Sequence, residues 1–284
     1  MNRPSFDGKY VTGELSKLAT EIPKQTTIFI IGGLALINYG LKAATKDIDI
    51  VVRSRQELET LVSSLERLGY HSLGYVVISK PYKKLEAARI LENADGFRWD
   101  IFHQQVCKAL IFTDTMAARA KTFYEERLLS AKMVSKEDIF LFKGITEREA
   151  DMDDMRLLSE SGLNWKVIEK ECKDQSALSG KIWECALLDN LSDLRTKYKI
   201  RSPIEENLRK VAEEKLSERI LTSAISKGCV TIKMISNATK ISYRLVREYA
   251  RRMEEKGLLK IDKTGLPYKL ELIKKPWKDS STKL

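Results

Sequence analysis

The chain has 284 residues, with 50 lysines and arginines, 40 aspartates and glutamates, 43% hydrophobic and 8% aromatic residues. A chain of this length and composition buries a core in two or three domains, which excludes disordered, collagen-like and low-complexity proteins. The longest apolar run, over 28–37, contains two glycines and is too short to cross about 30 Å of hydrocarbon. We therefore expect no membrane partner, and a cytoplasmic location because the sequence shows no signal-peptide pattern.

The excess positive charge is concentrated in the last quarter of the chain. Residues 1–216 carry 34 basic and 33 acidic side chains, whereas residues 217–284 carry 16 and 7, a net charge of +9. A local field of this sign acts on polyanions such as nucleic acid or anionic lipid and does not determine the fold. The pattern favours a nucleic-acid partner for this segment, with solubility alone as the alternative.

Residues 1–104 have the pattern of an α/β unit, in which short apolar runs alternate with helical periods. A β-branched run over 27–31 predicts a buried strand that stops at Gly32 and Gly33, and a short helix follows over 34–39. Alternation over 47–52 predicts a second strand, with Asp47 and Asp49 on one face. The same segment contains a predicted helix over 56–68 and further predicted strands over 75–78 and 97–102.

Residues 105–204 are predicted to form a helical segment that completes the functional site. Helical periods are clearest over 137–155 and 183–194. Pro203 disfavours helix at Ser202 and so predicts a boundary, after which residues 205–216 form a charged helical connector.

Residues 217–275 are predicted to form a winged helix-turn-helix domain, followed by a basic tail over 276–284. The predicted helices cover 219–226, 231–238 and 242–256, the last with Ser242 as N-cap and Gly257 as its end. Strands over 258–261 and 268–272 predict a β-hairpin. The expected fold class is therefore α+β, with a mixed sheet, a helical middle segment and a C-terminal winged helix.

Two neighbouring features of the first segment predict phosphate and metal chemistry. Gly32 and Gly33 follow a buried strand and precede a helix, which lets the backbone approach a phosphate closely. Asp47 and Asp49 project from one strand face, where carboxylate oxygens suit shared Mg²⁺ ions. Asp100, on a later predicted strand, is the candidate third carboxylate.

These residues resemble the nucleotidyltransferase superfamily, the fold of polymerase beta and the tRNA-CCA-adding enzymes. The resemblance rests on Ile31-Gly32-Gly33-Leu34-Ala35, followed by Thr45-Lys46-Asp47-Ile48-Asp49-Ile50-Val51. A later stretch, from Glu137 to Lys143 and then from Thr146 to Met155, is similar to the lysine-plus-aspartate element of AbiEii-like and archaeal minimal nucleotidyltransferases. The resemblance covers roughly residues 20–160 and leaves the winged segment outside it.

The resemblance implies a role for each matching residue. Asp47, Asp49 and Asp100 would be the catalytic carboxylates that bind Mg²⁺ or Mn²⁺, with Asp100 also helping to activate the attacking hydroxyl. The nucleoside triphosphate would be bound by Gly32, Gly33, Thr45, Lys143, Asp151 and Asp154. Lys143 would reach the triphosphate as an exposed side chain, with both aspartates positioned near it along one continuous helix. Ala43 and Ala44 stand where many members have arginine, and Lys42 is the candidate substitute.

The basic segment has the residue pattern of a nucleic-acid reader. On its third predicted helix, Leu245, Tyr249 and Met253 are expected to pack inward. The residues expected to contact DNA or structured RNA are Tyr243, Arg244, Arg247, Arg251, Lys260, Lys263 and Lys269. A winged helix used only for protein contact is the alternative.

Three functions fit the sequence. The first is a Mg²⁺-dependent enzyme that moves a nucleoside monophosphate from a triphosphate to an acceptor hydroxyl, with a nucleic-acid-binding module. The second is a DNA-binding regulator whose transferase-like domain is inactive or senses nucleotides. The third is the toxin of a toxin–antitoxin pair, modifying tRNA or protein. The nucleotide, the acceptor and the oligomeric state, including a homodimer, stay open.

Overall fold

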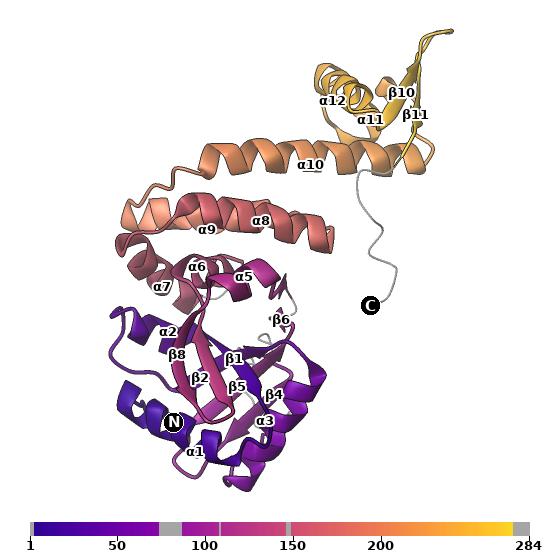
Figure 1. The fold of residues 1–284 in the computed structure, drawn as a ribbon. Coiled ribbons are helices and arrows are strands. Elements are labelled where there is room, and N and C mark those ends of the chain that lie inside the picture. Colours follow the sequence, from indigo (N-terminus) through magenta and orange to yellow (C-terminus); the bar gives the residue numbers. More distant parts are fainter. Residues whose placement is uncertain (1–2, 74–86, 108, 146–148, 275–284) are drawn as a thin grey trace. The chain divides into compact units, whose positions relative to one another are not determined.

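The computed structural model describes residues 3–73, 87–107, 109–145 and 149–274 (Figure 1). The chain divides into two compact units, one of residues 1–171 and 190–201 and the other of residues 172–189 and 202–284. Within the described ranges, no helix is long and apolar enough to cross a lipid bilayer. The strand predicted over 75–78 lies outside the described residues.

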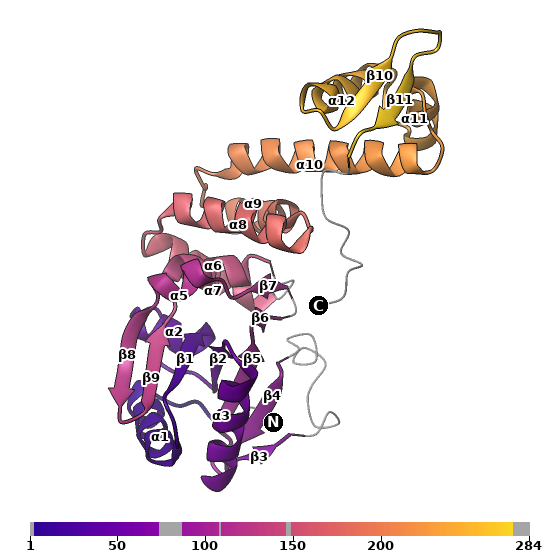
Figure 2. The ribbon, with the colours of Figure 1, turned by 45° about the vertical axis from the view of Figure 1, so that its right-hand side comes forward.

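A mixed seven-stranded sheet with the order β3-β4-β5-β2-β1-β9-β8 forms the centre of the first unit (Figure 2). β1 pairs antiparallel with β2 and parallel with β9, while β2 pairs parallel with β5. This confirms the predicted α+β class and mixed sheet. Its strands are β1 (Thr26–Ile31), β2 (Asp47–Val52), β3 (His71–Ser72), β4 (Arg89–Glu92), β5 (Arg98–His103), β8 (Lys121–Glu126) and β9 (Leu129–Met133).

The segment predicted to be helical from residue 105 onward begins instead with strands. The short strands β6 (Gln105–Val106) and β7 (Leu110–Ile111) pair with each other, and β8 and β9 form an antiparallel pair at one end of the main sheet. The prediction was wrong here because β9 contains Ser130, Ala131 and Lys132, which do not favour a strand by themselves. Burial beside β1, with which β9 pairs along five residues, overrides that local preference.

Helices surround this sheet. α1 and α3 contact each other and α3 contacts four strands, so both belong to one layer. α1 was not predicted from the sequence; Asp7 caps it and Val11, Leu15 and Leu18 are its buried side. Helices with residues in this unit are α1 (Gly8–Glu21), α2 (Gly32–Asn38), α3 (Arg55–Arg67), α5 (Asp114–Arg119), α6 (Lys136–Lys143), α7 (Glu149–Glu160), α8 (Trp165–Ser179) and α9 (Trp183–Tyr198). By the division above, α8 and α9 also contribute residues to the second unit.

The helix predicted over 137–155 is two helices. α6 ends at Lys143 with Gly144 as C-cap, and α7 begins at Glu149. Glycine is a poor residue for a helix interior, and here it marks the end. The prediction of one continuous helix was therefore wrong.

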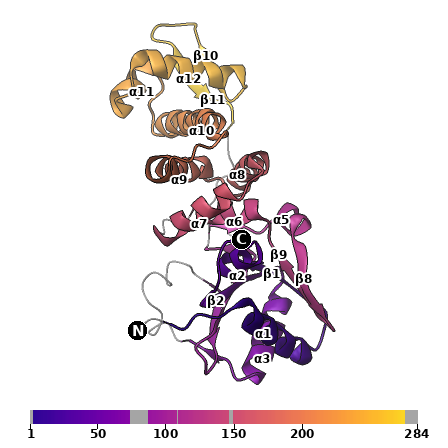
Figure 3. The ribbon, with the colours of Figure 1, turned by 90° about the vertical axis from the view of Figure 1, so that its left-hand side faces the viewer.

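Residues 205–272 of the second unit form three helices and a β-hairpin around one apolar core (Figure 3). They are α10 (Glu205–Ser226), α11 (Ile232–Thr239), α12 (Tyr243–Glu255), β10 (Leu259–Asp262) and β11 (Lys269–Leu272). Ser242 caps α12 and Gly257 follows it with a positive φ of 65°, as the sequence predicts.

Two details of this unit differ from the sequence prediction. The predicted connector and the first helix of the winged segment are one helix, α10, without a break at 216. On α12 the buried side chains are Val246, Ala250 and Met253, whereas Leu245 is exposed. Placing Leu245 inward was wrong because the buried stripe of α12 runs through Val246, Ala250 and Met253, and Leu245 lies beside that stripe.

Candidate active site

The three aspartates singled out by the sequence lie on the central strands of the sheet. β2 and β5 run parallel with Asp49 opposite Asp100, and Ile31 at the end of β1 lies opposite Asp49. Because side chains alternate along a strand and register partners point the same way, Asp47, Asp49 and Asp100 share one face. The fold thus brings together carboxylates separated by about fifty residues in the sequence.

Asp100 is the most unusual of the three. It is fully buried, and neither of its carboxylate oxygens has a hydrogen-bond partner among the described residues. Burial first, and then the nearby carboxylates of Asp49 and Asp47, raise the pKa of Asp100 well above its usual range. Burying a carboxyl group without a hydrogen-bond partner lowers the stability of the fold. Such groups are typical of sites that bind a ligand.

The two glycines make room for the side chains of β2 and the segment before it. Gly32 has a φ of 67°, and a Cβ atom there would lie 1.9 Å from Asp49 Oδ2. At Gly33 a Cβ atom would lie 2.6 Å from Thr45 Oγ1. Thr45 donates from Oγ1 to the Asp47 carbonyl at 2.9 Å, which ties the start of β2 to this turn. The glycines are therefore required where Asp49 and Thr45 approach the start of α2.

Lys143 lies in a buried network of charges and is not exposed, contrary to the sequence prediction. Its Nζ is 2.8 Å from Asp151 Oδ1 and 2.7 Å from Asp154 Oδ2, and all three residues are buried. Lys42 Nζ lies 2.5 Å from the other oxygen of Asp154. Burial alone lowers the pKa of Lys143, but the two carboxylates outweigh it, so the pKa lies above its usual value. The predicted association of these residues is observed, although across two helices.

A pocket of about 410 Å³ is lined by the two glycines, Asp47, Asp49 and the Lys143 network, whereas the buried Asp100 is not among its lining residues. A volume of this size is in the range of sites for small-molecule ligands. Its polar wall includes the glycines, Thr45, Asp47, Asp49 and the Lys143 network. The pocket also has apolar lining residues, Phe102, Val106, Ile139 and Phe142, which sequence reasoning did not assign to the site. Phe102 lies two residues after Asp100, and Ile139 and Phe142 lie in the stretch from Glu137 to Lys143 that carries the resemblance, so Val106 is the one without a signal in the sequence.

The residue types of this site suit a divalent cation. Oxygen ligands are those that Mg²⁺ prefers, and Mg²⁺ retains waters or substrate phosphates beside one or two carboxylates. Among the described residues no group of three or more His, Cys, Asp or Glu side chains is close enough together to hold a metal ion alone. The unpartnered oxygens of Asp100 fit such an ion, whose remaining ligands would come from a nucleotide and water.

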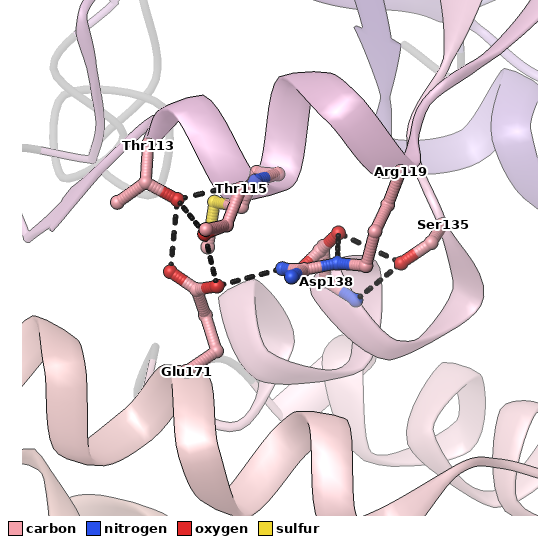
Figure 4. Close-up of polar contacts among 7 residues, drawn as sticks. Thr113, Thr115, Arg119, Ser135, Asp138 and Glu171 are labelled. Carbon is pink, nitrogen blue, oxygen red and sulfur yellow. Dashed lines mark hydrogen bonds and ion pairs between the residues drawn. The ribbon is translucent and has the colours of Figure 1, made fainter.

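A second buried network fixes the start of α6, the helix that carries Lys143 (Figure 4). Arg119 donates to both oxygens of Asp138, at 3.1 and 2.5 Å, and to Glu171 at 2.7 Å. Thr113 and Thr115 each donate to Glu171 at 2.9 Å, and Ser135 donates to Asp138 at 2.7 Å. Burial raises the pKa of Glu171, but hydrogen bonds led by that from Arg119 outweigh it and leave the pKa lowered.

Arg119→Lys is expected to lower the free energy of unfolding by about 1–3 kcal/mol, because lysine cannot donate in the same fork to both carboxylates. Thermal unfolding measures this loss. Arg55→Lys is the matched control, since the Arg55–Glu59 pair is exposed on α3 and contributes little. Equal melting temperatures for the two variants would show that the Arg119 network does not stabilise the unit.

The residues predicted to contact nucleic acid are all exposed in the second unit. They are Tyr243, Arg244, Arg247, Arg251, Lys260, Lys263 and Lys269. Arg251 Nε lies 3.5 Å from Glu255 and Lys263 Nζ 3.8 Å from Glu254, both as exposed pairs that water and salt screen. Their side chains are accessible, and their role stays a prediction.

The mixed sheet with this site is of the nucleotidyltransferase type. A family model described as "Nucleotidyltransferase of unknown function (DUF6036)" matches residues 9–202, and the chain belongs to this family. A search of curated proteins gave no match.

Similar solved structures include two antibiotic adenylyltransferases. The lincosamide antibiotic adenylyltransferase LnuA, lincomycin-bound, has 16% identity and a TM-score of 0.39, covering 56% of this chain and 100% of its own. ANT(2")-Ia in complex with adenylyl-2"-tobramycin has 15% identity and a TM-score of 0.38, covering 57% and 92%. A candidate nucleotidyltransferase from H. pylori has 14% identity and a TM-score of 0.33, covering 73% and 93%.

Proposed function

We propose that this nucleotidyltransferase uses Mg²⁺ or Mn²⁺ to move a nucleoside monophosphate from a triphosphate to an acceptor hydroxyl, with Asp47, Asp49 and Asp100 as its catalytic carboxylates. The observation that carries the proposal is the register of Asp49 beside the buried, unpartnered Asp100, next to a glycine turn. Membership of the nucleotidyltransferase family supports the reaction class.

Each residue has a distinct task in this proposal. Asp47 and Asp49, together with Asp100, would hold the cation, which when bound would stabilise the attacking and leaving oxygens of an in-line displacement. Asp100 accepts the proton of the attacking hydroxyl through a carboxylate oxygen, and its raised pKa suits a proton acceptor. The pocket orients the two reactants, which removes much of the entropic barrier.

The polar wall of the pocket would bind the triphosphate. Gly32 and Gly33 are the first two residues of α2 and line the pocket beside Asp47 and Asp49. Lys143 and Lys42 supply two positive charges for the phosphates. Their ammonium groups are positioned by ion pairs with the carboxylates of Asp151 and Asp154. The apolar lining residues of the pocket would exclude water from the reacting groups.

The direct test is to incubate the purified protein with each α-³²P-labelled nucleoside triphosphate, Mg²⁺ or Mn²⁺, and either total RNA, DNA or the protein alone. Metal-dependent transfer of label to any acceptor supports the proposal, and label on tRNA or protein would favour the toxin function. Absence of transfer with every triphosphate and acceptor would favour the regulator with an inactive domain.

For the second unit we propose a winged helix that binds DNA or structured RNA. Three helices followed by a hairpin, with exposed arginines on α12 and exposed lysines on the hairpin, support this. Residues near the N-terminus of α12, including Tyr243, Arg244 and Arg247, would lie near base edges, and the hairpin lysines near phosphates.

Alanine at Arg244, Arg247 and Arg251 is expected to make the dependence of duplex affinity on salt less steep. Each arginine on a phosphate releases about one counterion, so the slope of log affinity against log salt should fall by about 0.9 per residue, or about 2.7 for all three. Salt titration of duplex binding by the full-length chain measures the slope.

The matched control replaces three exposed basic residues of the first unit, Lys9, Lys121 and Arg201, and so removes the same net charge. It should keep the wild-type slope. An equal change of slope in both variants would mean that net charge alone, and not the α12 surface, determines binding.

A further inference from the structure

A short segment before α1, residues 3–7, runs beside the start of β2, and we call it the N-terminal strap. Phe6 and Thr45 exchange two backbone hydrogen bonds, at 2.7 and 2.9 Å. The ring of Phe6 packs against Tyr10 at 4.5 Å and Phe97 at 5.0 Å between centroids. These contacts fix the strap next to the carboxylates of the candidate site.

The fixed strap places the Arg3 guanidinium on one of those carboxylates. Arg3 Nη1 lies 3.1 Å from Asp47 Oδ2, and Nη2 donates to the Lys46 carbonyl at 2.7 Å. Only 19% of the Arg3 side chain and 15% of the Asp47 side chain are exposed, so water screens this pair weakly. Two bonds from one planar fork hold the guanidinium in a defined orientation.

This contact occupies the carboxylate that a divalent cation would need. A guanidinium bound to Asp47 Oδ2 repels a doubly charged ion brought to the same partly buried oxygen. The positive charge of Arg3 also opposes the rise in the pKa of Asp100, so it acts on the whole carboxylate cluster. Arg3 therefore offsets part of the negative charge that would attract a cation.

We infer that Arg3 is a positioning residue that holds Asp47 and competes with the divalent cation, so that the cation binds only when the guanidinium releases Asp47. This inference rests on the proposed function, because it takes Asp47 and Asp49 as cation ligands. The strap then regulates the affinity for the cation. The fraction of molecules in which Arg3 has released Asp47 determines the apparent dissociation constant.

The test is Mn²⁺ binding without nucleotide, measured by isothermal titration calorimetry on the full-length protein. If Arg3 holds Asp47 in roughly nine molecules of ten, Arg3→Gln should bind Mn²⁺ about tenfold more tightly than wild type. Arg3→Lys keeps the charge without the fork and should lie between the two. Lys9→Gln, which removes an exposed positive charge on α1, should leave the affinity unchanged.

Other outcomes overturn the inference in distinguishable ways. Unchanged or weaker Mn²⁺ binding by Arg3→Gln, with a lower melting temperature, would make Arg3 purely structural. Unchanged Mn²⁺ binding with weaker triphosphate binding would make Arg3 a nucleotide ligand. If Asp49→Asn binds Mn²⁺ as tightly as wild type does, the cation site itself is misassigned, and the proposed function fails together with the inference.

Discussion

Replacing Asp49 with asparagine should lower metal-dependent nucleotide transfer at least about 100-fold and leave the fold intact. Asparagine has nearly the shape of aspartate, so it fits the space beside Gly32 that the glycine leaves open. What is lost is one negative charge at the reacting centre, and loss of electrostatic stabilisation of this kind costs about 3 kcal/mol in the transition state. Initial rates at saturating triphosphate, with melting temperatures, measure both parts of the prediction.

The matched control is Asp193→Asn, which removes one carboxylate charge from an exposed position on α9. It should keep the wild-type rate. Transfer by Asp49→Asn at the wild-type rate would remove Asp49 from the catalytic carboxylates, and the assignment of Asp47 through strand alternation would fall with it.

The central strands β1 and β2 were predictable because all of their local sequence signals favour a strand. β-branched residues, a glycine stop and strict alternation give β1 and β2 within one residue of their observed bounds. The same alternation places Asp47 and Asp49 on one face. The pairing of Asp49 with Asp100 depends on the order of strands in the sheet, which no local pattern contains. From the sequence, Asp100 was therefore only a candidate on a later strand, and its proposed role came from the family resemblance.

Other parts of the site depend on contacts between distant residues. Arg3 lies 44 residues before Asp47, and only the backbone bridge between Phe6 and Thr45 brings them together. Nothing in the composition of residues 3–7 indicates that bridge. The same reasoning applies to β9, whose strand conformation depends on burial beside β1. Long-range packing determined these features, and local propensity did not.

Lys143 shows how the burial of a candidate site residue changes the expected effect of replacing it. The sequence predicts an exposed lysine, for which alanine would leave thermal stability nearly unchanged. In the structure Lys143 is 9% exposed, and it separates two carboxylates, Asp151 and Asp154, that are each 4% exposed. Removing the cation leaves those two charges close together in a site with little water, while Lys42 still contacts Asp154.

We therefore expect Lys143→Ala to lower the free energy of unfolding by about 3–5 kcal/mol, the usual cost of breaking a buried ion pair by removing one partner. For a unit of this size that corresponds to a fall of roughly 6–20 °C in melting temperature. Thermal unfolding monitored by circular dichroism measures it. A melting temperature equal to that of wild type would contradict the buried network.

A second variant separates the structural role of Lys143 from its proposed contact with the triphosphate. Lys143→Met combined with Asp151→Leu and Asp154→Leu removes the buried charges together, and replacing a buried ion pair by apolar residues of similar volume is often neutral for stability. This variant should recover most of the lost melting temperature while binding triphosphate as weakly as Lys143→Ala. If it instead recovers both stability and triphosphate affinity, the network only stabilises α6 against α7, and the phosphates are bound elsewhere in the pocket.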